Sequence, residues 1–337
     1  MQQRQRPRIL RNHKLQKMKF ELTILGSGSS IPTADRNSAA QVLNVLGRHF
    51  LIDCAEATQH RLRLFHVPYN RINHIFISHL HGDHFYGLMG FLSTLSLQGR
   101  RGEMHIYADS RLQELIGMQL KIMRGHFLFP IVFHALGREE EVIYEDKVVR
   151  VSSFPLKHRC EAPVCGFLFR EKERERTILK DMVEEWKIPV AFMQHLKKGA
   201  DYVTPSGEIV ANCRLTAPPP LPRSYAYMTD TIFREEFAGF VQGVSLLYHE
   251  ATYGREEEAL ARECYHSTAE QAARLAKAAG AGKLLLGHFS ARYRNPGCLL
   301  PEARAVFPES YICSDGDVYG IPAQKRQERA CGCTGCF

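Results

Sequence analysis

The sequence predicts an α/β fold, a four-layer αββα sandwich with an inserted arm, and three observations support this class. Apolar, β-branched runs alternate with segments of helical apolar spacing in the first half of the chain, which is typical of layered α/β architecture. The same alternation resumes in the last third of the chain. Between them, residues 171–222 are first highly charged and then polar with Gly and Pro, so we expect an arm inserted into a sandwich of residues 19–322.

The first half of the chain opens with strands. Residues 18–26 predict a strand that leads into a Gly/Ser turn, and residues 42–53 predict a hairpin that ends on an acidic residue. Helical apolar spacing predicts helices over residues 85–99 and 111–123. Short apolar runs predict further strands at 72–79, 103–109, 131–134, 141–145, 147–154 and 164–170.

The arm and the second half follow. Residues 171–189 carry many charges at helical spacing and predict a helix, and a solvated surface helix and loop would fit the composition of the whole arm equally well. A Ser/Thr start and a Gly stop delimit a helix over residues 267–280. Strands are expected at 224–230, 243–252 and 283–289.

The composition is that of an ordinary folded protein. Of the 337 residues, 45% are hydrophobic and 24% are charged, without the polar bias of disordered chains. No run approaches the ~20 apolar residues that cross a bilayer. The basic extension of residues 1–18 has no apolar segment behind it, so we expect neither a secretory signal nor a membrane anchor. The net charge of +8 makes a polyanionic partner plausible.

The cysteines indicate a reducing compartment. Most of the ten lie singly along the chain, as buried thiols do, so we expect a cytoplasmic protein. The tail of residues 323–337 contains Cys331, Cys333 and Cys336, which could bind a soft metal or form disulfides. Three thiols lack the fourth ligand of a tetrahedral zinc site, and we assign this tail no function.

The strongest chemical signal is the segment His79-Leu80-His81-Gly82-Asp83-His84, which follows a predicted strand and precedes a predicted helix. At such a turn the backbone can direct His79 and His81 to one metal ion while Asp83 and His84 reach a second, because Gly82 allows a tight path. Imidazole and carboxylate ligands suit zinc, although manganese or iron could compete. Two metal ions about 3.5–4 Å apart would support in-line phosphoryl displacement by water, which indicates a hydrolase.

Further ligands are expected where later strands end. His158, Asp230 and His288 each follow an apolar run, at the point where side chains from different strands converge on one edge of a sheet. Each residue alone would more often be an ordinary polar strand end. Their shared placement favours metal binding.

Several segments together resemble the ribonuclease Z family (tRNase Z, short form) of the metallo-β-lactamase superfamily. They are LGSGSSIPTADRN, LIDCAEATQHRL, SHLHGDHFYGLMGFL, PLKHRCEAPVCGFLF, YMTDT, HEAT and GHFSARY. The resemblance implies the four-layer metallo-β-lactamase sandwich and two Zn²⁺ per subunit. It makes His79, His81 and His158 ligands of one zinc, makes Asp83, His84 and His288 ligands of the other, and places Asp230 as the bridge.

The resemblance also implies roles in catalysis and binding. Asp83 would be the general base, His266 the proton donor to the leaving 3′-oxygen, and Glu250 the carboxylate that orients His266. A histidine suits this role because its ordinary pKa lies near working pH; from position alone, His266 would be a surface residue before a helix. The substrate-binding residues would be Arg36, Asn37, Lys197, Lys198, Ser290 and Arg292.

The implied function is an endonuclease that cuts precursor tRNA after the discriminator nucleotide, leaving a 3′-hydroxyl on the tRNA and a 5′-phosphate on the trailer. The arm would be the element that grips tRNA, and the protein would be a homodimer. Two departures from the family pattern are Ala34 in place of a lysine and the lack of a Gly-Pro before LKKG in the arm. The alternatives are a small-substrate phosphodiesterase or arylsulfatase-like hydrolase of the same fold, and a non-catalytic RNA-binding protein.

Overall fold

The computed structural model describes residues 19–324 and 326, which fall into two compact units. The larger unit contains the described residues up to Arg170 together with Ser224–Ile321. The smaller unit contains Glu171–Arg223 and the described residues from Pro322 onward. The expectations for the extension of residues 1–18 and for the three tail cysteines lie outside the described residues. None of the described helices is long and apolar enough to cross a membrane.

The larger unit is built on two seven-stranded sheets. The first has the order β18-β1-β2-β3-β4-β5-β6; its first four strands pair antiparallel, and the pairs from β3 to β6 are parallel. Its strands are β1 Phe20–Gly26, β2 Ala40–Val45, β3 Arg48–Cys54, β4 Ile72–Phe76, β5 Met104–Ala108, β6 Ile131–Ala135 and β18 Val318–Gly320.

The second sheet has the order β17-β16-β15-β14-β9-β8-β7, in which β14 to β17 run parallel. Its strands are β7 Glu141–Glu145, β8 Val149–Pro155, β9 Cys165–Glu171, β14 Ser224–Met228, β15 Leu246–Glu250, β16 Leu284–Gly287 and β17 Ser310–Ile312. Parallel neighbours end at the same edge of a sheet. The polar residues that follow β14 and β16 therefore meet at one edge.

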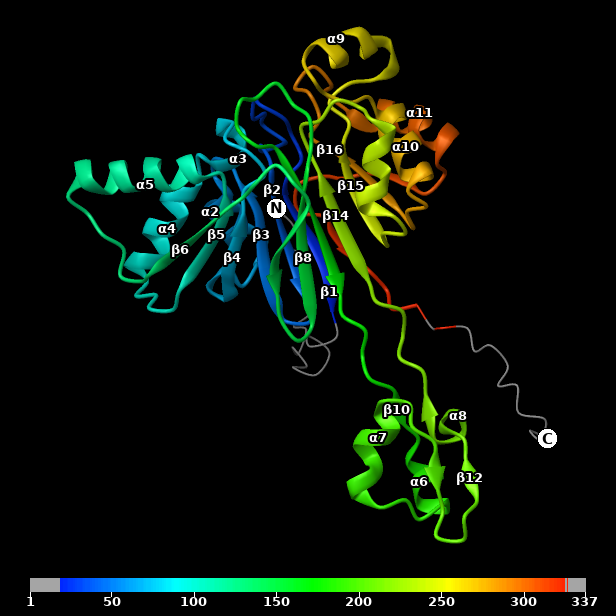
Figure 1. Cartoon of the computed structure of the whole chain (residues 1–337). Helices are drawn as coiled ribbons and strands as arrows, with labels where there is room; N and C mark the ends of the chain where they lie inside the picture. Colours follow the sequence, from blue (N-terminus) through cyan, green and yellow to red (C-terminus); the bar gives the residue numbers. More distant parts are fainter. Residues whose placement is uncertain (1–18, 325, 327–337) are drawn as a thin grey trace, which may run out of the picture. The chain divides into compact units, whose positions relative to one another are not determined.

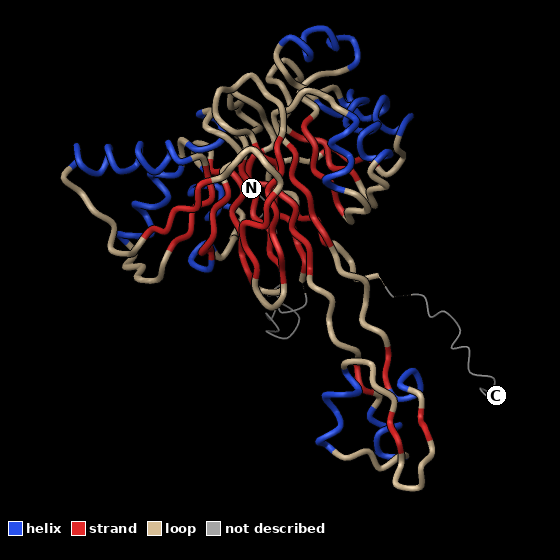
Figure 2. Tube along the Cα trace, in the orientation of Figure 1, coloured by secondary structure: helices blue, strands red, loops and turns tan. Residues whose placement is uncertain are grey.

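Helices cover the outer faces of both sheets, with α2, α4 and α5 on the first and α10 and α11 on the second (Figures 1 and 2). A capping box between Thr268 and Gln271 starts α10, and the Asp109 side chain caps α5. The helices are α2 Thr58–Leu64, α3 Gly82–Phe85, α4 Leu88–Leu97, α5 Ser110–Met123, α9 Glu258–Glu263, α10 Ala269–Ala278 and α11 Leu300–Val306, with 3-10 turns at Tyr69–Arg71, Glu235–Val241, Arg255–Glu257 and Pro296–Leu299.

Alternate side chains along the strands of the first sheet point to opposite faces and pack into two different cores. On β3, Phe50 and Ile52 belong to the cluster between the sheets, whereas Leu51 packs with the residues under α4 and α5. The rings of Phe76 and Phe169, which come from different sheets, pack edge to face at 5.4 Å. Apolar layers on both sides of the first sheet hold the strand ends in place, and this confirms the predicted four-layer sandwich.

The smaller unit has its own small core, formed by Ile188, Leu196, Tyr202, Val210 and Leu215. Its elements are β10 Thr177–Ile178, α6 Lys180–Glu185, a 3-10 turn Val190–Phe192, α7 Met193–Lys197, β11 Tyr202–Val203, β12 Ile209–Val210, α8 Asn212–Leu215 and β13 Thr216–Ala217.

The helix predicted over residues 171–189 is wrong for most of its length. Helix α6 begins only at Lys180, because the residues before it form the short strand β10. In this strand Thr177 pairs with Ala217 and Ile178 pairs with Thr216. At the start of this unit, Glu171 and Arg223 form a buried ion pair of 2.7 Å between Oε1 and Nη2. Tertiary pairing has overridden a charge pattern of helical spacing.

Candidate metal centre

The segment after β4 makes the turn that the chemistry requires. His79 is buried beyond the end of β4, and α3 begins at Gly82, so the following Asp83 and His84 lie on a single helical turn. A Cβ atom at position 82 would lie 2.2 Å from the ring of Tyr86, so any other residue there would have to displace that ring. Gly82 is not among the described residues of positive φ, so this turn makes use of the small size of glycine and not of a left-handed backbone.

Four side chains from three parts of the chain form a first group, namely His79, His81, His158 and Asp230, with one ligand atom of each within 4.8 Å of the others. Nε2 of His79 and Nε2 of His158 each lie 3.6 Å from Oδ2 of Asp230. The strand ends at β8 and β14 thus converge on the turn after β4.

A second group consists of Asp83, His84 and His288. Oδ1 of Asp230 lies 3.4 Å from Nε2 of His84 and 3.0 Å from Nε2 of His288. The two carboxylate oxygens of Asp230 therefore face different groups, as a bridging ligand would require. The structure brings together all seven side chains that the sequence analysis singled out as ligands.

Unpartnered atoms show that this site fits metal ions. Among the described residues, Nε2 of His79, His84 and His288 and Oδ2 of Asp83 are buried and make no hydrogen bond, although they lie 3.0–3.7 Å from one another or from the Asp230 carboxylate. Buried polar atoms in proteins are rarely left without a hydrogen bond. A set of imidazole nitrogens and carboxylate oxygens at one point suits Zn²⁺.

In three of the histidines, the other ring nitrogen is held from outside the centre. Nδ1 of His84 lies 2.7 Å from Asp53 Oδ2, Nδ1 of His288 lies 3.0 Å from Thr252 Oγ1, and Nδ1 of His158 lies 3.0 Å from the carbonyl of Tyr265. Such contacts fix the tautomer in which Nε2 carries the lone pair and can bind a metal.

Burial and neighbouring charges act differently on the two groups. Burial is the largest cause that lowers the pKa of His79, and the neighbouring imidazole of His84 lowers it further. Burial also lowers the pKa of His288, but Asp230, Asp83 and Glu250 together outweigh burial and raise that pKa to about 10. The first group therefore favours neutral imidazoles, the form that binds metal, and the carboxylates around the second group attract positive charge.

Asp53 is a positioning residue that the sequence analysis noted as an acidic strand end but did not assign. It is fully buried at the end of β3, and its carboxylate accepts hydrogen bonds from the backbone N–H of Ser78 at 2.8 Å and from the Tyr227 hydroxyl at 2.7 Å. Asp53, Asp230 and His288 all have positive φ, near 50°, which is costly for residues other than glycine. The strand-end signal that indicated Asp230 could have identified Asp53 as well.

Next to the centre, His266 is paired with Glu250. Nδ1 of His266 lies 3.0 Å from both carboxylate oxygens of Glu250, and its ring centroid is 4.8 Å from that of His158. Its side chain is only 11% exposed, so it is not a surface residue. Burial lowers the pKa of His266, but the carboxylates of Glu250 and Asp230 together outweigh burial and raise that pKa above its ordinary value.

Thr252 connects this pair to the metal centre. Its hydroxyl donates to Oε2 of Glu250 at 2.5 Å, so its oxygen can accept from Nδ1–H of His288 at 3.0 Å. One hydroxyl thus holds both a candidate ligand and the carboxylate that orients His266. The sequence analysis quoted this residue as the last one of HEAT but assigned it no role.

The remaining predicted residues have different surroundings. Arg36 is buried, and its guanidinium donates to the carbonyl of Tyr293 at 2.7 Å. The Arg292 guanidinium lies over the ring of Tyr253 at 5.0 Å. Asn37, Ser290 and Arg292 are at least partly accessible, and Lys197 and Lys198 belong to the smaller unit. Substrate binding by this set stays a prediction, and the contacts of Arg36 are structural ones.

Comparisons with known proteins agree with this architecture. Ribonuclease Z of Bacteroides fragilis is 48% identical over 298 residues, which are 88% of this chain and 97% of that protein. Ribonuclease Z of Porphyromonas gingivalis is 42% identical over 297 residues, again 88% of this chain and 97% of its own length. A family model described as Anti-Pycsar protein Apyc1 matches residues 20–185.

Solved structures show the same fold. Human tRNase Z, short form, has a TM-score of 0.66 at 27% identity, covering 90% of this chain and 99% of that chain. The metallo-β-lactamase fold protein YhfI from Bacillus subtilis has a TM-score of 0.63 at 17% identity, covering 89% and 98%, and supports the fold alone. The sandwich with its His/Asp cluster thus defines a metallo-β-lactamase fold hydrolase. Within that class, the chain belongs to the ribonuclease Z family.

Proposed function

We propose that this protein is a zinc-dependent endoribonuclease that cleaves precursor tRNA 3′ of the discriminator nucleotide, leaving a 3′-hydroxyl on the tRNA and a 5′-phosphate on the trailer. The observation that carries the proposal is the set of buried, unpartnered Nε2 atoms and the Asp83 oxygen around Asp230. Family membership supports the substrate, since the relatives are named ribonuclease Z and tRNase Z. We place the enzyme in the cytoplasm, in keeping with the buried thiols of Cys54, Cys165 and Cys313.

We assign metal binding and proton transfer to different residues of the centre. His79, His81 and His158 would hold one zinc ion, Asp83, His84 and His288 the other, and Asp230 would face both. When bound, the two ions supply a water of lowered pKa and stabilise charge on the entering and leaving oxygens. Asp83 would accept the proton of the attacking water, and His266, oriented by Glu250, would give a proton to the leaving 3′-oxygen.

Mapping the cut on a trailer-bearing precursor tRNA tests the function directly. We expect cleavage just after the discriminator nucleotide, two zinc ions per chain by metal analysis, and loss of cleavage after treatment with a chelator that added zinc reverses. Hydrolysis of bis(p-nitrophenyl) phosphate without cleavage of the precursor would favour a small-substrate hydrolase. Precursor binding with no hydrolysis of either substrate at full zinc loading would favour a non-catalytic RNA-binding protein.

We propose that the smaller unit is the tRNA-binding arm. It is joined to the larger unit through β9 and β14, which pair antiparallel with Arg170 opposite Ser224. Replacing residues 171–223 with Asn-Gly should therefore close a two-residue hairpin and leave the sandwich intact. We expect KM for precursor tRNA to rise by about tenfold or more, with hydrolysis of bis(p-nitrophenyl) phosphate unchanged. Equal loss on both substrates would show instead that the segment supports the fold.

We also propose a homodimer that forms through α5. This helix buries Leu112 and Ile116 but exposes an apolar stripe of Leu115, Met118 and Ile122, of which Ile122 is 75% exposed. Residues at this spacing share one helix face, and an apolar stripe in water favours burial against a second copy.

Ile122→Glu should shift the molar mass measured by light scattering from dimer to monomer, because a charge would be buried at the interface. Gln113→Glu adds the same charge to the same helix about 180° away and should leave the dimer intact. A wild-type monomer, or equal effects of both variants, would contradict this interface.

A further inference from the structure

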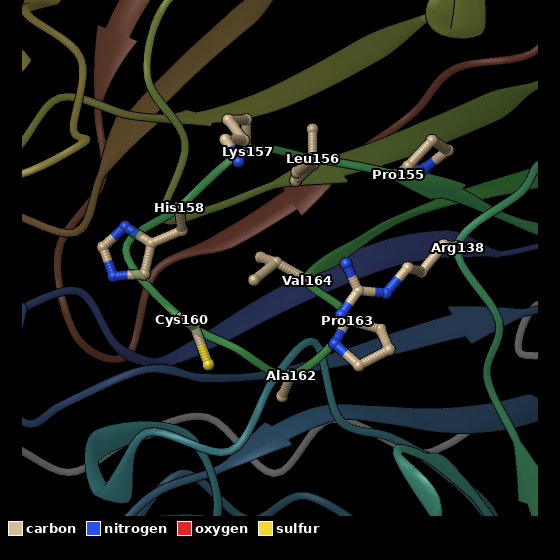
Figure 3. A pocket seen from close by; sticks show the side chains of 9 residues that line it. All are labelled: Arg138, Pro155, Leu156, Lys157, His158, Cys160, Ala162, Pro163 and Val164. Atoms are coloured by element: carbon tan, nitrogen blue, oxygen red, sulfur yellow. The ribbon is translucent and has the colours of Figure 1, made fainter.

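A pocket of about 200 Å³ lies between the β8–β9 loop and the loop that follows β6 (Figure 3). Three of its lining residues, Leu156, Ala162 and Val164, are buried and apolar. Two basic residues, Lys157 and Arg138, also line it and are exposed. The full lining is Arg138, Pro155, Leu156, Lys157, His158, Cys160, Ala162, Pro163 and Val164.

The pocket adjoins one side of the metal centre. His158, which lines it, is also a member of the first ligand group. In Figure 3, His158 and Arg138 stand at opposite ends of the lining side chains. The ring of His158 is 4.8 Å from the ring of His266. The pocket therefore shares a candidate zinc ligand with the centre, and that ligand lies next to the proposed proton donor.

Size and chemistry limit what the pocket can hold. Its volume of about 200 Å³ is below the ~300–1,000 Å³ of sites for drug-sized ligands, so one ring system fits better than several nucleotides. Apolar walls suit the face of a base, and the cations suit a phosphate. Nη2 of Arg138 donates to the carbonyl of Glu161 at 2.7 Å, which holds this cation at the rim.

We infer that the pocket seats the base of the nucleotide whose 3′-oxygen leaves, the discriminator nucleotide, with Lys157 beside its phosphate. This inference rests on the proposed function and adds a substrate subsite to it. The apolar walls contact the face of the base and do not read its edge, so the subsite accepts all four bases. It contributes to binding and takes no part in proton transfer.

Filling the pocket tests the subsite. Cys160→Phe adds bulk to the lining, and Glu161→Phe adds bulk at the neighbouring exposed position outside it. We expect Cys160→Phe to raise KM for precursor tRNA about tenfold, with zinc content, melting temperature and hydrolysis of bis(p-nitrophenyl) phosphate unchanged. Glu161→Phe should leave KM within about twofold. An unchanged KM in a folded Cys160→Phe protein would overturn the inference.

A second pair of measurements keeps the inference testable if that variant does not fold. Lys157→Gln should reduce the slope of log KM against log salt by about one, as expected for one lost phosphate contact. A precursor that is abasic at the discriminator position should bind the wild-type enzyme about tenfold more weakly. An unchanged salt slope, or a loss that appears only when the first trailer nucleotide is abasic, would contradict the assignment. If the wild-type enzyme does not cut precursor tRNA at all, the proposed function itself fails.

Discussion

Asp83→Asn is expected to lower kcat by roughly 10²- to 10⁴-fold on both precursor tRNA and bis(p-nitrophenyl) phosphate. Oδ2 of Asp83 lies 3.4 Å from Nε2 of His84 and 3.7 Å from Nε2 of His288, where it faces the centre. An amide of the same size cannot accept the proton of the attacking water. Both substrates need this step, so both should lose turnover.

Steady-state kinetics at saturating zinc, together with metal analysis, check this result. Asp35→Asn makes the same substitution in an exposed loop and should leave kcat unchanged. Near-wild-type turnover by Asp83→Asn with two bound ions would contradict the assignment of Asp83 as the general base. Low turnover that persists with two bound ions would support it, because loss of metal could then not explain the effect.

His266→Ala should separate the two substrates. The leaving 3′-oxygen of an RNA needs a proton, so we expect a loss of roughly 10²- to 10⁴-fold in kcat on precursor tRNA. p-Nitrophenolate leaves as a stable anion, so hydrolysis of bis(p-nitrophenyl) phosphate should change little. The geometry behind this prediction is the contact of Nδ1 of His266 with Glu250 at 3.0 Å.

The Thr252 hydroxyl provides the matched controls for His266→Ala. Thr252→Val removes the hydroxyl that contacts both Glu250 and His288, so we expect tRNA cleavage to fall and measure bound zinc beside it, whereas Thr252→Ser keeps both contacts and should retain activity. His266 also lies near Asp230 and His288, so it has the geometry of a metal ligand. Equal loss on both substrates, with a fall in bound zinc, would show that His266 binds metal instead of donating a proton.

Local patterns predicted most of the fold. The strands over 103–109 and 141–145 and the helix over 111–123 appear at nearly the expected bounds, because apolar period and turn residues act over a few neighbours. The short helices α2, α9 and α11 and the edge strands β17 and β18 were not predicted. They are only three to seven residues long, too short for a periodic signal, and depend on tertiary contacts.

Burial of individual polar residues could not be predicted. Arg36 was expected at the substrate, yet its guanidinium bonds carbonyls of residues more than 250 positions away. His266 looked like a surface residue before a helix, yet Glu250 and the ring of His158 surround it. Such surroundings depend on which strands become neighbours in the sheets, and the order of the strands cannot be deduced from a single sequence.

The sequence by itself determined the αββα class, the family and the seven candidate ligands, since strand periodicity and a dense His/Asp turn are local properties. Only the tertiary structure decided which oxygen of Asp230 faces which group, how Asp53 and Thr252 hold the ring nitrogens of His84 and His288, and where the pocket beside His158 lies. The physical reason is that hydrogen bonds and cavities arise between segments far apart in the chain. Their geometry exists only after both sheets have packed around a common core.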